Sequence, residues 1–369
     1  MGQTIIGLNN PMAVKIYSGN LAVDIPRKGY WTRKFMGKGE TPTKPLWQLT
    51  NLEADSGEQI TYDLNMQLKQ VPTQGDNLIE GKEEGLVFYS DVVYIDQLRG
   101  GIDCGGRMTR KRTLHDLRKI GKARGTDWWA RLFDETIFMY LSGSRGTNAE
   151  YIEPTTFSGY ANNSFTAPDS QHIVYGGTAT SQATVATTDK FGVDAIDRCV
   201  AIAGMMGGGT AGIPQITPAN IEGEDQFLCV IDEWQAFDMR TGAGTNGWAE
   251  IQKALATALG NKSPFITGAL GIHNGVVIHK HQNVVRFTNY GANSDVAASR
   301  ALFLGVQAGT IAFGSPGKDL RFGWTEESKD AGNKVAIYTN TIVGIKKVTF
   351  NGLDFGVMCI DTAAKRPGT

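Results

Sequence analysis

The sequence lacks the features of a membrane, exported or strongly nucleic-acid-binding protein. Its 36 lysines and arginines nearly cancel its 37 aspartates and glutamates, so no overall field draws the chain to nucleic acid or to an acidic membrane surface. Its apolar runs fall short of the roughly 20 residues that a membrane helix needs. The N-terminus carries no basic segment followed by an apolar stretch, so we expect neither export nor a membrane partner.

Cysteine and proline are also scarce. The four cysteines, Cys104, Cys199, Cys229 and Cys359, lie far apart and form no C-x-x-C pair, so we expect reduced, buried thiols in a cytoplasmic setting. Only 12 prolines accompany 46 glycines. Because glycine confers backbone freedom, this ratio predicts many turns or flexible segments.

Motifs of catalysis and cofactor binding are missing too. The chain contains no nucleophile elbow and no dinucleotide fingerprint, which favours a protein that is not an enzyme and holds no cofactor. The glycine-rich stretch 204–212 could cradle a phosphate, but it lacks the Gly-Lys-Ser/Thr ending and follows a predicted helix instead of a strand. A mobile loop is the favoured interpretation.

Two small clusters remain as candidate sites. His279 and His281 are two apart in a predicted strand and so share a face, with His273 nearby. A zinc site would need further ligands at suitable spacing, so surface or interface histidines are favoured. Asp232 and Glu233 end a predicted buried strand, where carboxylates can be catalytic or can cap the next helix; capping is favoured.

Residues 1–56 show no sustained hydrophobic period, which predicts an extended arm without a core element. The arm is basic, because six cations stand against Glu40. It is either solvated, or it lies on a neighbour or faces nucleic acid. The six cations are Arg27, Lys28, Arg33, Lys34, Lys38 and Lys44.

Strict alternation begins at Ile60, where every second residue is apolar as in a half-buried strand. Apolar segments at 86–89 and 92–95 supply returning strands, so a long hairpin is predicted. An isolated two-stranded ribbon is marginal in water, so this hairpin needs a surface to lie against. The apolar face comprises Ile60, Tyr62, Leu64, Met66 and Leu68.

Apolar residues at three- and four-residue steps between Thr109 and Leu141 predict the longest helix. Gly121 and Gly125 predict a bend or a close contact in its middle, and Ser142-Gly143 predicts its end. The remaining pattern is mixed α+β. It comprises predicted helices at 189–206, 233–239 and 248–259, and predicted strands at 227–231, 276–279, 284–287, 335–345 and 357–360.

A second basic cluster lies between Arg99 and Arg124, where nine cations stand against Asp103 and Asp116. Such a cluster could bind nucleic acid through counterion release or could pair with acidic patches on adjacent subunits. The nine are Arg99, Arg107, Arg110, Lys111, Arg112, Arg118, Lys119, Lys122 and Arg124.

Several of these segments together resemble a known family. The stretch GKEEGLVFYSD at 81–91, IDQLR at 95–99 and GGRM at 105–108 resemble the E-loop and the entry to the spine helix of a major capsid protein family of tailed phages with the Hong Kong 97-type fold. The likeness continues through RTLHDLR at 112–118, SPFITGALG at 263–271 and NGLDFG at 351–356. It runs in order over roughly residues 50–365.

The resemblance implies an α+β capsid fold with an N-terminal arm (1–56), an E-loop hairpin (57–106), a peripheral domain with the spine helix (107–187) and an axial domain (188–320). Residues 321–369 would return strands to the peripheral domain and complete the axial one. It also implies self-assembly into pentamers and hexamers of an icosahedral head around double-stranded DNA, bound without sequence specificity. Assembly in the host cytoplasm would involve a separate scaffold and a portal, with or without a decoration protein.

On this interpretation, the apolar face of the hairpin and four cations of the arm, Arg27, Lys28, Arg33 and Lys34, contact other subunits. Five cations of the second cluster, Arg107, Arg110, Lys111, Arg118 and Lys122, face the lumen and its DNA. Two alternatives stay open: a nanocompartment shell of the same fold, and an unrelated two-domain enzyme that uses Asp232-Glu233 or His279 and His281.

Overall fold

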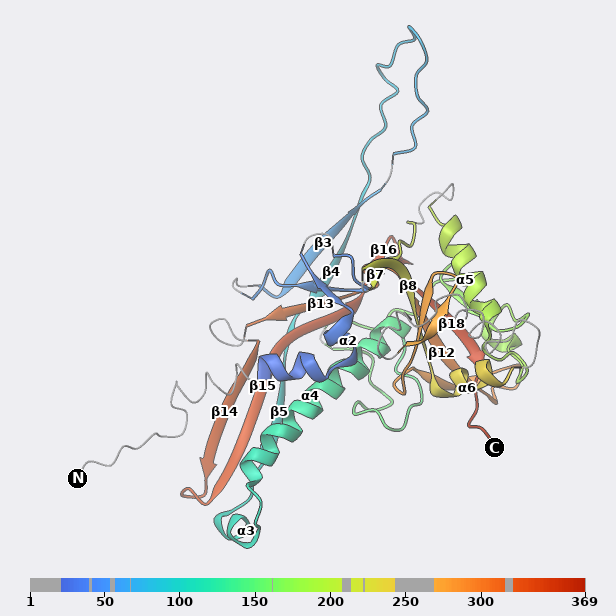
Figure 1. Ribbon diagram of the computed structural model, residues 1–369. Coiled ribbons are helices and arrows are strands. Elements are labelled where there is room, and N and C mark those ends of the chain that lie inside the picture. Colours follow the sequence, from blue (N-terminus) through green and yellow to red (C-terminus); the bar gives the residue numbers. More distant parts are fainter. Residues whose placement is uncertain are drawn as a thin grey trace.

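The computed structural model describes residues 21–39, 42–53, 57–66, 68–160, 162–207, 214–221, 223–242, 269–315 and 321–368. Within them, two large β-sheets and a long helix form an elongated body, from which a β-hairpin projects (Figure 1). No helix in this part of the chain is both long and apolar enough to cross a bilayer.

The first sheet is organised by one long strand, β15 (Lys334–Lys347). One edge of β15 pairs with β5 (Asp96–Asp103), and the other pairs first with β14 (Phe322–Lys329) and then with β13 (Gly309–Gly314), all antiparallel. Two short strands, β2 (Leu46–Leu49) and β1 (Met36–Lys38), extend the sheet beyond β13. Segments from the two ends of the chain thus share one six-stranded sheet.

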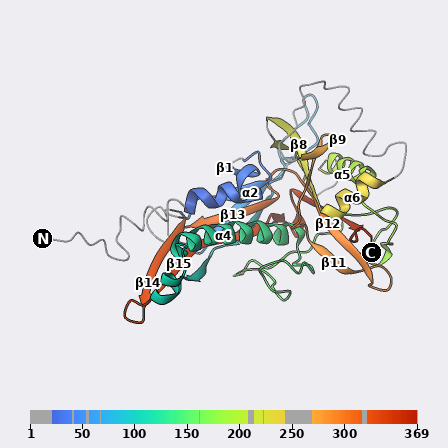
Figure 2. The ribbon, with the colours of Figure 1, turned by 60° about the horizontal axis from the view of Figure 1, so that its bottom comes forward.

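Helix α4 (Leu117–Ser142) packs along this sheet, as Figures 1 and 2 show. Its predicted end is confirmed, since Gly143 caps it in the left-handed conformation with φ of 69°. The predicted close contact is also present: a Cβ on Gly125 would lie 2.9 Å from Ile102 Cδ1 of β5, and one on Gly121 would lie 3.4 Å from Ile102 Cγ2. Gly125 therefore lets the helix approach the sheet, whereas Gly121 faces the same strand with room for a methyl group.

The predicted start of this helix is wrong. A separate short helix, α3 (Arg107–Arg112), precedes α4, and Thr113 between them is extended. The reason is Asp116, whose carboxylate accepts hydrogen bonds from the backbone N–H groups of Arg118 (3.1 Å) and Lys119 (3.2 Å) and so begins a new helix. The chain leaves the helical conformation between α3 and α4, just before this cap.

The second sheet has eight strands. Five strands pair in the order β18, β12, β8, β10, β9, with β6 beside β18 at one edge, and β11 and β7 add to β12 and β8. Helices α5 (Val193–Met205) and α6 (Glu233–Thr241) pack against it. The strands are β6 (Ile173–Tyr175), β7 (Ala219–Ile221), β8 (Glu224–Ile231), β9 (Ala269–His273), β10 (Val276–Lys280), β11 (Arg286–Tyr290), β12 (Val296–Leu304) and β18 (Val357–Ala363).

The core is continuous between the two sheets. One cluster of buried side chains joins Trp129 and Phe133 of α4 to Ile337 of the first sheet and to Val230 and Leu302 of the second. All four cysteines are buried and free, as predicted.

The N-terminal segment departs from the prediction of an arm without a core element. Residues 21–28 are helical, α2 (Tyr30–Lys34) follows, and Leu21, Ile25, Trp31 and Phe35 are buried in the main core. Leu21 and Ile25 are four residues apart, as are Trp31 and Phe35. Two apolar residues at helical spacing are too few to indicate a helix in the sequence. The prediction is wrong for residues 21–39 and 42–49, and residues 1–20 lie outside the described part.

An acidic residue of α4 holds the start of α2. The Asp134 carboxylate accepts hydrogen bonds from the backbone N–H groups of Tyr30 (2.8 Å) and Trp31 (3.1 Å). Burial raises the pKa of Asp134 to about 6. Helices α2 and α4, which lie side by side in Figure 2, are therefore joined by polar hydrogen bonds inside an apolar contact.

The predicted hairpin is present. Strand β3 (Gln59–Asn65) pairs antiparallel with β4 (Phe88–Tyr94), and the connecting residues extend away from the body in Figure 1. Below it, β16 (Thr349–Phe350) and β17 (Leu353–Asp354) form a small hairpin. A 3-10 turn, η1 (Gln182–Thr184), lies between α4 and α5.

Most other sequence predictions match an element. Helix 189–206 is found as α5, strand 227–231 and helix 233–239 as β8 and α6, and strands 276–279, 335–345 and 357–360 as β10, β15 and β18. The strand expected at 284–287 is displaced to β11, and helix 248–259 lies outside the described residues, as does most of the 204–212 stretch. Strands β12, β13 and β14 have no counterpart among the predictions.

Candidate interaction surfaces

The apolar face of the hairpin changes from buried to exposed along β3. Ile60 and Tyr62 are each only 6% exposed, packed with Val93 and Phe350 of the same chain. The hydroxyl of Tyr62 donates to Asp91 (2.9 Å), and burial raises its pKa above the usual value. Ile60 and Tyr62 are thus covered by their own chain, which corrects their assignment to contacts with another subunit.

Beyond this point the face is open. Leu64 and Met66 are half-buried and Leu68 is 60% exposed. The loop that follows exposes a further set of large apolar side chains. So many exposed large apolar side chains in one segment are unusual on a monomeric soluble protein. The exposed set is Leu68, Val71, Leu78, Ile79, Leu86, Val87 and Phe88.

The base of the hairpin is held firmly, in contrast with its end. The ammonium group of Lys346 forms an ion pair with Asp91 and donates to the carbonyl of Val92 (3.0 Å). The side chain of Asn163 accepts from the N–H of Tyr94 (3.1 Å) and donates to its carbonyl (2.6 Å). The hairpin therefore leaves the body at a fixed place.

The five cations expected to face the lumen differ in their surroundings, since some are exposed and others bind groups of their own chain. Arg107 and Lys111 are exposed on α3, whereas the guanidinium of Arg110 donates to the carbonyl of Asn333 (3.1 Å). Arg118 donates twice to the buried carboxylate of Glu326 (3.0 and 2.6 Å). Lys122 is half-buried on α4.

The four cations of the N-terminal segment that were expected at a subunit contact also differ in exposure and pairing. Lys28 forms an ion pair of 2.6 Å with Asp127 of α4, inside its own chain. Arg27 and Arg33 are exposed, and Lys34 is half-buried beside His279, whose pKa it helps to lower. Arg27, Lys28 and Arg33 are thus the exposed cations of the four, and the charge of Lys28 is already paired within the chain.

His279 of β10 and His281, one residue beyond its end, face the same side, as predicted, since both rings contact Tyr30 (centroids 5.9 and 4.6 Å apart). His279 is 2% exposed, so the interpretation as a surface or interface residue is wrong for it. Burial lowers the pKa of both imidazoles to about 4. Residues 269–315 and the other described segments contain no group of three or more potential metal ligands.

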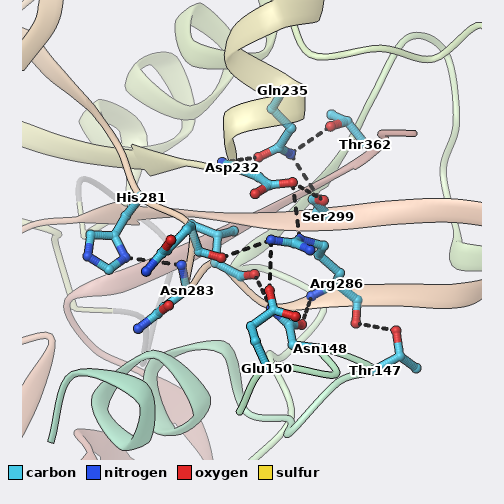
Figure 3. A network of polar contacts seen from close by, with 12 residues as sticks. Thr147, Asn148, Glu150, Asp232, Gln235, His281, Asn283, Arg286, Ser299 and Thr362 are labelled. Carbon is cyan, nitrogen blue, oxygen red and sulfur yellow. Dashed lines mark hydrogen bonds and ion pairs between the residues drawn. The ribbon is translucent and has the colours of Figure 1, made fainter. Parts of the chain in front are cut away.

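Asp232 caps a helix, as favoured from the sequence. It is the N-cap of α6 and forms a capping box, in which its N–H donates to the side-chain oxygen of Gln235 (2.9 Å). Figure 3 shows a network around it: Oδ2 accepts from Ser299 Oγ (3.1 Å) and lies 3.4 Å from Arg286 Nε. Burial raises the pKa of Asp232, and the residue is fully enclosed by protein. Glu233 is exposed and pairs with Lys280 (2.8 Å).

The network extends to the loop after α4. The guanidinium of Arg286 forms an ion pair with Glu150 (3.1 Å), and the backbone N–H of Arg286 donates to the side-chain oxygen of Asn148 (2.8 Å). The loop is therefore held on β11 (Figure 3). The amide of Gln235 donates to the Ser299 carbonyl (3.0 Å) and to Thr362 (2.8 Å). Since the groups pair with one another, the arrangement is suited to holding elements together.

The sequence did not predict a second buried network. Arg300 of β12 donates to both oxygens of Asp361 and, over 2.8 Å, to the carbonyl of Ser142 at the end of α4. The hydroxyl of Tyr290 also donates to Asp361 (2.5 Å). A single arginine within the apolar run 296–304 was the signal that could have identified it, because a buried charge requires a partner.

Comparison with known proteins gives a consistent result. A family model described as phage capsid protein matches residues 6–366. The major capsid protein of Pseudomonas phage KPP25 is 25% identical over 358 residues, which cover 88% of this chain and 89% of that protein. The solved capsid of Ralstonia phage GP4 is 46% identical over the whole of both chains, with a TM-score of 0.84.

More distant structures share the fold. The capsid protein of cyanophage Pam1 is 18% identical, with a TM-score of 0.69 over 92% of this chain and 93% of that one. The α+β fold of Hong Kong 97 type is thereby confirmed.

Proposed function

Because the chain belongs to the phage capsid protein family, we propose that its copies assemble into pentamers and hexamers of an icosahedral head that encloses double-stranded DNA. The protein is a major capsid protein and a structural part of the virion capsid. The observation that best supports the assembly we propose is the projecting hairpin. It is anchored at its base, it exposes a row of apolar side chains, and it has too little core of its own.

Hairpin and body have complementary roles in this proposal. The two sheets, α4 and the buried Arg286 and Arg300 networks form a stiff unit, whereas the hairpin reaches onto a neighbour. The contact residues that we propose are Leu64, Met66 and Leu68 of the hairpin, together with Arg27 and Arg33. An arm that buries itself on a neighbour gives a larger interface than the roughly 1,600 Å² of an ordinary complex.

The domain division stays part of the proposal, with one refinement. We propose an E-loop within 57–95, because β5 (96–103) pairs with β15 and belongs to the first sheet. The peripheral part would comprise 96–187 with the return strands after residue 321, and the axial part would contain the eight-stranded sheet with α5 and α6. Residues 1–20 would act as an arm.

Further partners complete the proposal. A separate scaffold, a portal and, in some shells, a decoration protein would act with the chain in the host cytoplasm. The lumen would hold DNA without sequence specificity, through counterion release at cations that lie on its inner surface. Neither a nanocompartment nor an enzyme is favoured, since the matched proteins are phage capsids.

Electron microscopy of the purified chain, expressed with and without a candidate scaffold, tests the assembly. We expect uniform polyhedral shells or rings of five and six, and nuclease-protected DNA in particles from infected cells. A stable monomer under all conditions would contradict the proposal.

In the variant Leu78→Asp/Ile79→Asp, both changes lie in the exposed loop, so shells should be lost while the subunit stays folded. The matched control Met205→Asp changes an equally open apolar side chain on α5.

A further inference from the structure

The loop between β3 and β4 continues the hairpin after backbone pairing has ended. Within the described residues, the last backbone hydrogen bond between its two arms runs from the N–H of Met66 to the carbonyl of Val87 (3.0 Å). Beyond this bond the arms still run out together in Figure 1. Exposed arms have no core to hold them, so other bonds must join them if they are to keep one shape.

Two side chains replace the backbone pairing at this point. The carboxylate of Glu84 accepts a hydrogen bond from the backbone N–H of Lys69 (2.6 Å), and the side-chain amide of Gln70 donates to the backbone carbonyl of Lys82. We call these four residues the clamp. Each arm supplies one side chain and one main-chain group, so the clamp fixes the path of both backbones.

The second arm presents its carbonyl next to a defined turn. Gly81 has a φ of 82°, the N–H of Lys82 donates to the carbonyl of Ile79 (3.1 Å), and the carboxylate of Glu83 accepts from the N–H of Gly81 (2.7 Å). Glycine adopts this left-handed conformation without strain. The acceptor for Gln70 is therefore part of an ordered turn.

The clamp encloses several of the exposed apolar side chains of the hairpin. Leu68 on the first arm and Leu86 on the second lie between the last backbone bond and the clamp, and both are exposed. Because the arms are joined on both sides of these residues, the two side chains keep a fixed spacing in the free subunit. The clamp thus orders a surface that has no partner within its own chain.

A surface that is ordered before binding loses less conformational freedom on binding, so more of the contact free energy remains as affinity. We propose that Glu84 and Gln70 are positioning residues for assembly, because they hold the arms together in the free subunit and present the loop in its bound shape. This inference rests on the proposed function, in which the hairpin binds another copy.

The rival role for Glu84 is a direct ion pair with a cation of another copy. Its carboxylate already accepts a hydrogen bond within its own chain, which favours positioning. The variant Glu84→Gln separates the two roles, because it keeps an acceptor oxygen for the Lys69 N–H and removes the charge.

Hydrogen exchange of the free subunit tests the clamp itself. In Glu84→Ala the N–H of Lys69 should exchange about fivefold faster, which is the factor that corresponds to one hydrogen bond of typical net strength. Gln70→Ala should also speed this exchange, although Gln70 does not bind that N–H, because both bonds hold the same two arms. Glu84→Gln should stay within about twofold of the unchanged chain.

The loop offers a matched control for each residue. Glu80 is an exposed acid and Gln74 an exposed amide, and within the described residues neither side chain forms a hydrogen bond or ion pair. Glu80→Ala and Gln74→Ala should therefore leave the exchange of Lys69 unchanged.

Assembly tests the consequence, under conditions in which the unchanged chain forms shells. The subunit concentration needed for shells, measured by light scattering, should rise about fivefold in Glu84→Ala and about twentyfold in Glu84→Ala/Gln70→Ala. Glu84→Gln and the two controls should assemble like the unchanged chain. The thermal unfolding midpoint of the free subunit should stay the same in all variants, because the loop lies outside the core.

Three results would overturn the positioning role. The first is an unchanged exchange of Lys69 in Glu84→Ala, and the second is faster exchange with unchanged assembly. The third is equal loss of assembly in Glu84→Gln and Glu84→Ala, which would assign Glu84 to a charge contact. All three leave the proposed function intact, whereas no shells from the unchanged chain under any condition would remove both.

Discussion

Arg300 on β12 and Asp361 on β18 face each other in register and are joined by two hydrogen bonds of 2.7 Å. The same guanidinium donates to the carbonyl of Ser142 at the C-terminal end of α4, where a cation is favourable. One side chain thus links the long helix to the eight-stranded sheet, and with it the two halves of the body.

Replacing Arg300 by Met should destabilise the subunit by about 3–5 kcal/mol, because Asp361 and the Ser142 carbonyl would remain buried without their partner. Urea unfolding of the free subunit measures this. Lys280→Met removes an exposed ion pair with Glu233 and should leave the unfolding midpoint almost unchanged. Equal effects of the two changes would contradict a special role for Arg300.

Acid should weaken the contact between α2 and β10 through His279. Burial lowers the pKa of this imidazole from the usual 6.5 to about 4, with further lowering from Lys34. The neutral form is therefore favoured in the fold, so stability is complete above pH 6.5 and is lost as the pH falls toward 4, by at most about 3 kcal/mol. His281 acts in the same direction.

Asp134 opposes this loss, because its pKa is raised from 3.8 to about 6 and its contribution to stability grows as the pH falls through that range. His279→Phe keeps an aromatic ring beside Phe35 and removes the buried proton site. Its unfolding free energy should fall less than that of the unchanged chain between pH 7.5 and 4.5. The exposed His115→Gln is the control, and an identical pH dependence in His279→Phe would count against this explanation.

Two glycines should respond in opposite ways to alanine. Gly121→Ala adds a methyl group about at van der Waals distance from Ile102 and removes a flexible residue from α4, so it should stabilise by about 0.5–1 kcal/mol. In Gly143→Ala the new Cβ would lie 2.1 Å from the Thr166 carbonyl oxygen at a φ of +69°, so it should destabilise by about 2 kcal/mol or more. Guanidinium unfolding compares the two, and a shift of the same sign for both would contradict the packing described.

The bend between α3 and α4 should depend on Asp116. Asp116→Ala removes the acceptor for the N–H groups of Arg118 and Lys119 and should cost about 1 kcal/mol. Asp116→Asn preserves an acceptor and should recover most of this. Circular dichroism and thermal unfolding report the change. If Asp116→Ala and Asp116→Asn behave alike, the cap does not begin this helix.

The sequence predicted those elements whose pattern is local. The alternation from Ile60 to Met66 predicts β3 correctly, and the Ser142-Gly143 pair predicts the end of α4. Asp232 was correctly interpreted as a cap because its partner, Gln235, is three residues away.

The elements that the sequence could not predict depend on partners that lie far away in the chain. Strand β14 alternates in burial only from Phe322 to Glu327, and its second half carries the charged residues Glu326, Glu327 and Lys329. It becomes a strand by pairing with β15. Leu21 and Trp31 become core residues because they pack in one cluster with α4, and His279 is buried against Tyr30 and Phe35. The role of Arg300 requires Ser142 and Asp361, which are far away in sequence.

The first sheet also sets the order in which the chain can fold. Strands β2 and β5 come from its first third, but their partners β13 and β15 are made near its end. Pairing at such sequence separation is slow, and it waits for synthesis of the last strands. Lys346, which fixes the base of the hairpin, is likewise translated long after its partner Asp91. A chain whose synthesis has not reached Lys346 therefore lacks a hairpin that is held at its base.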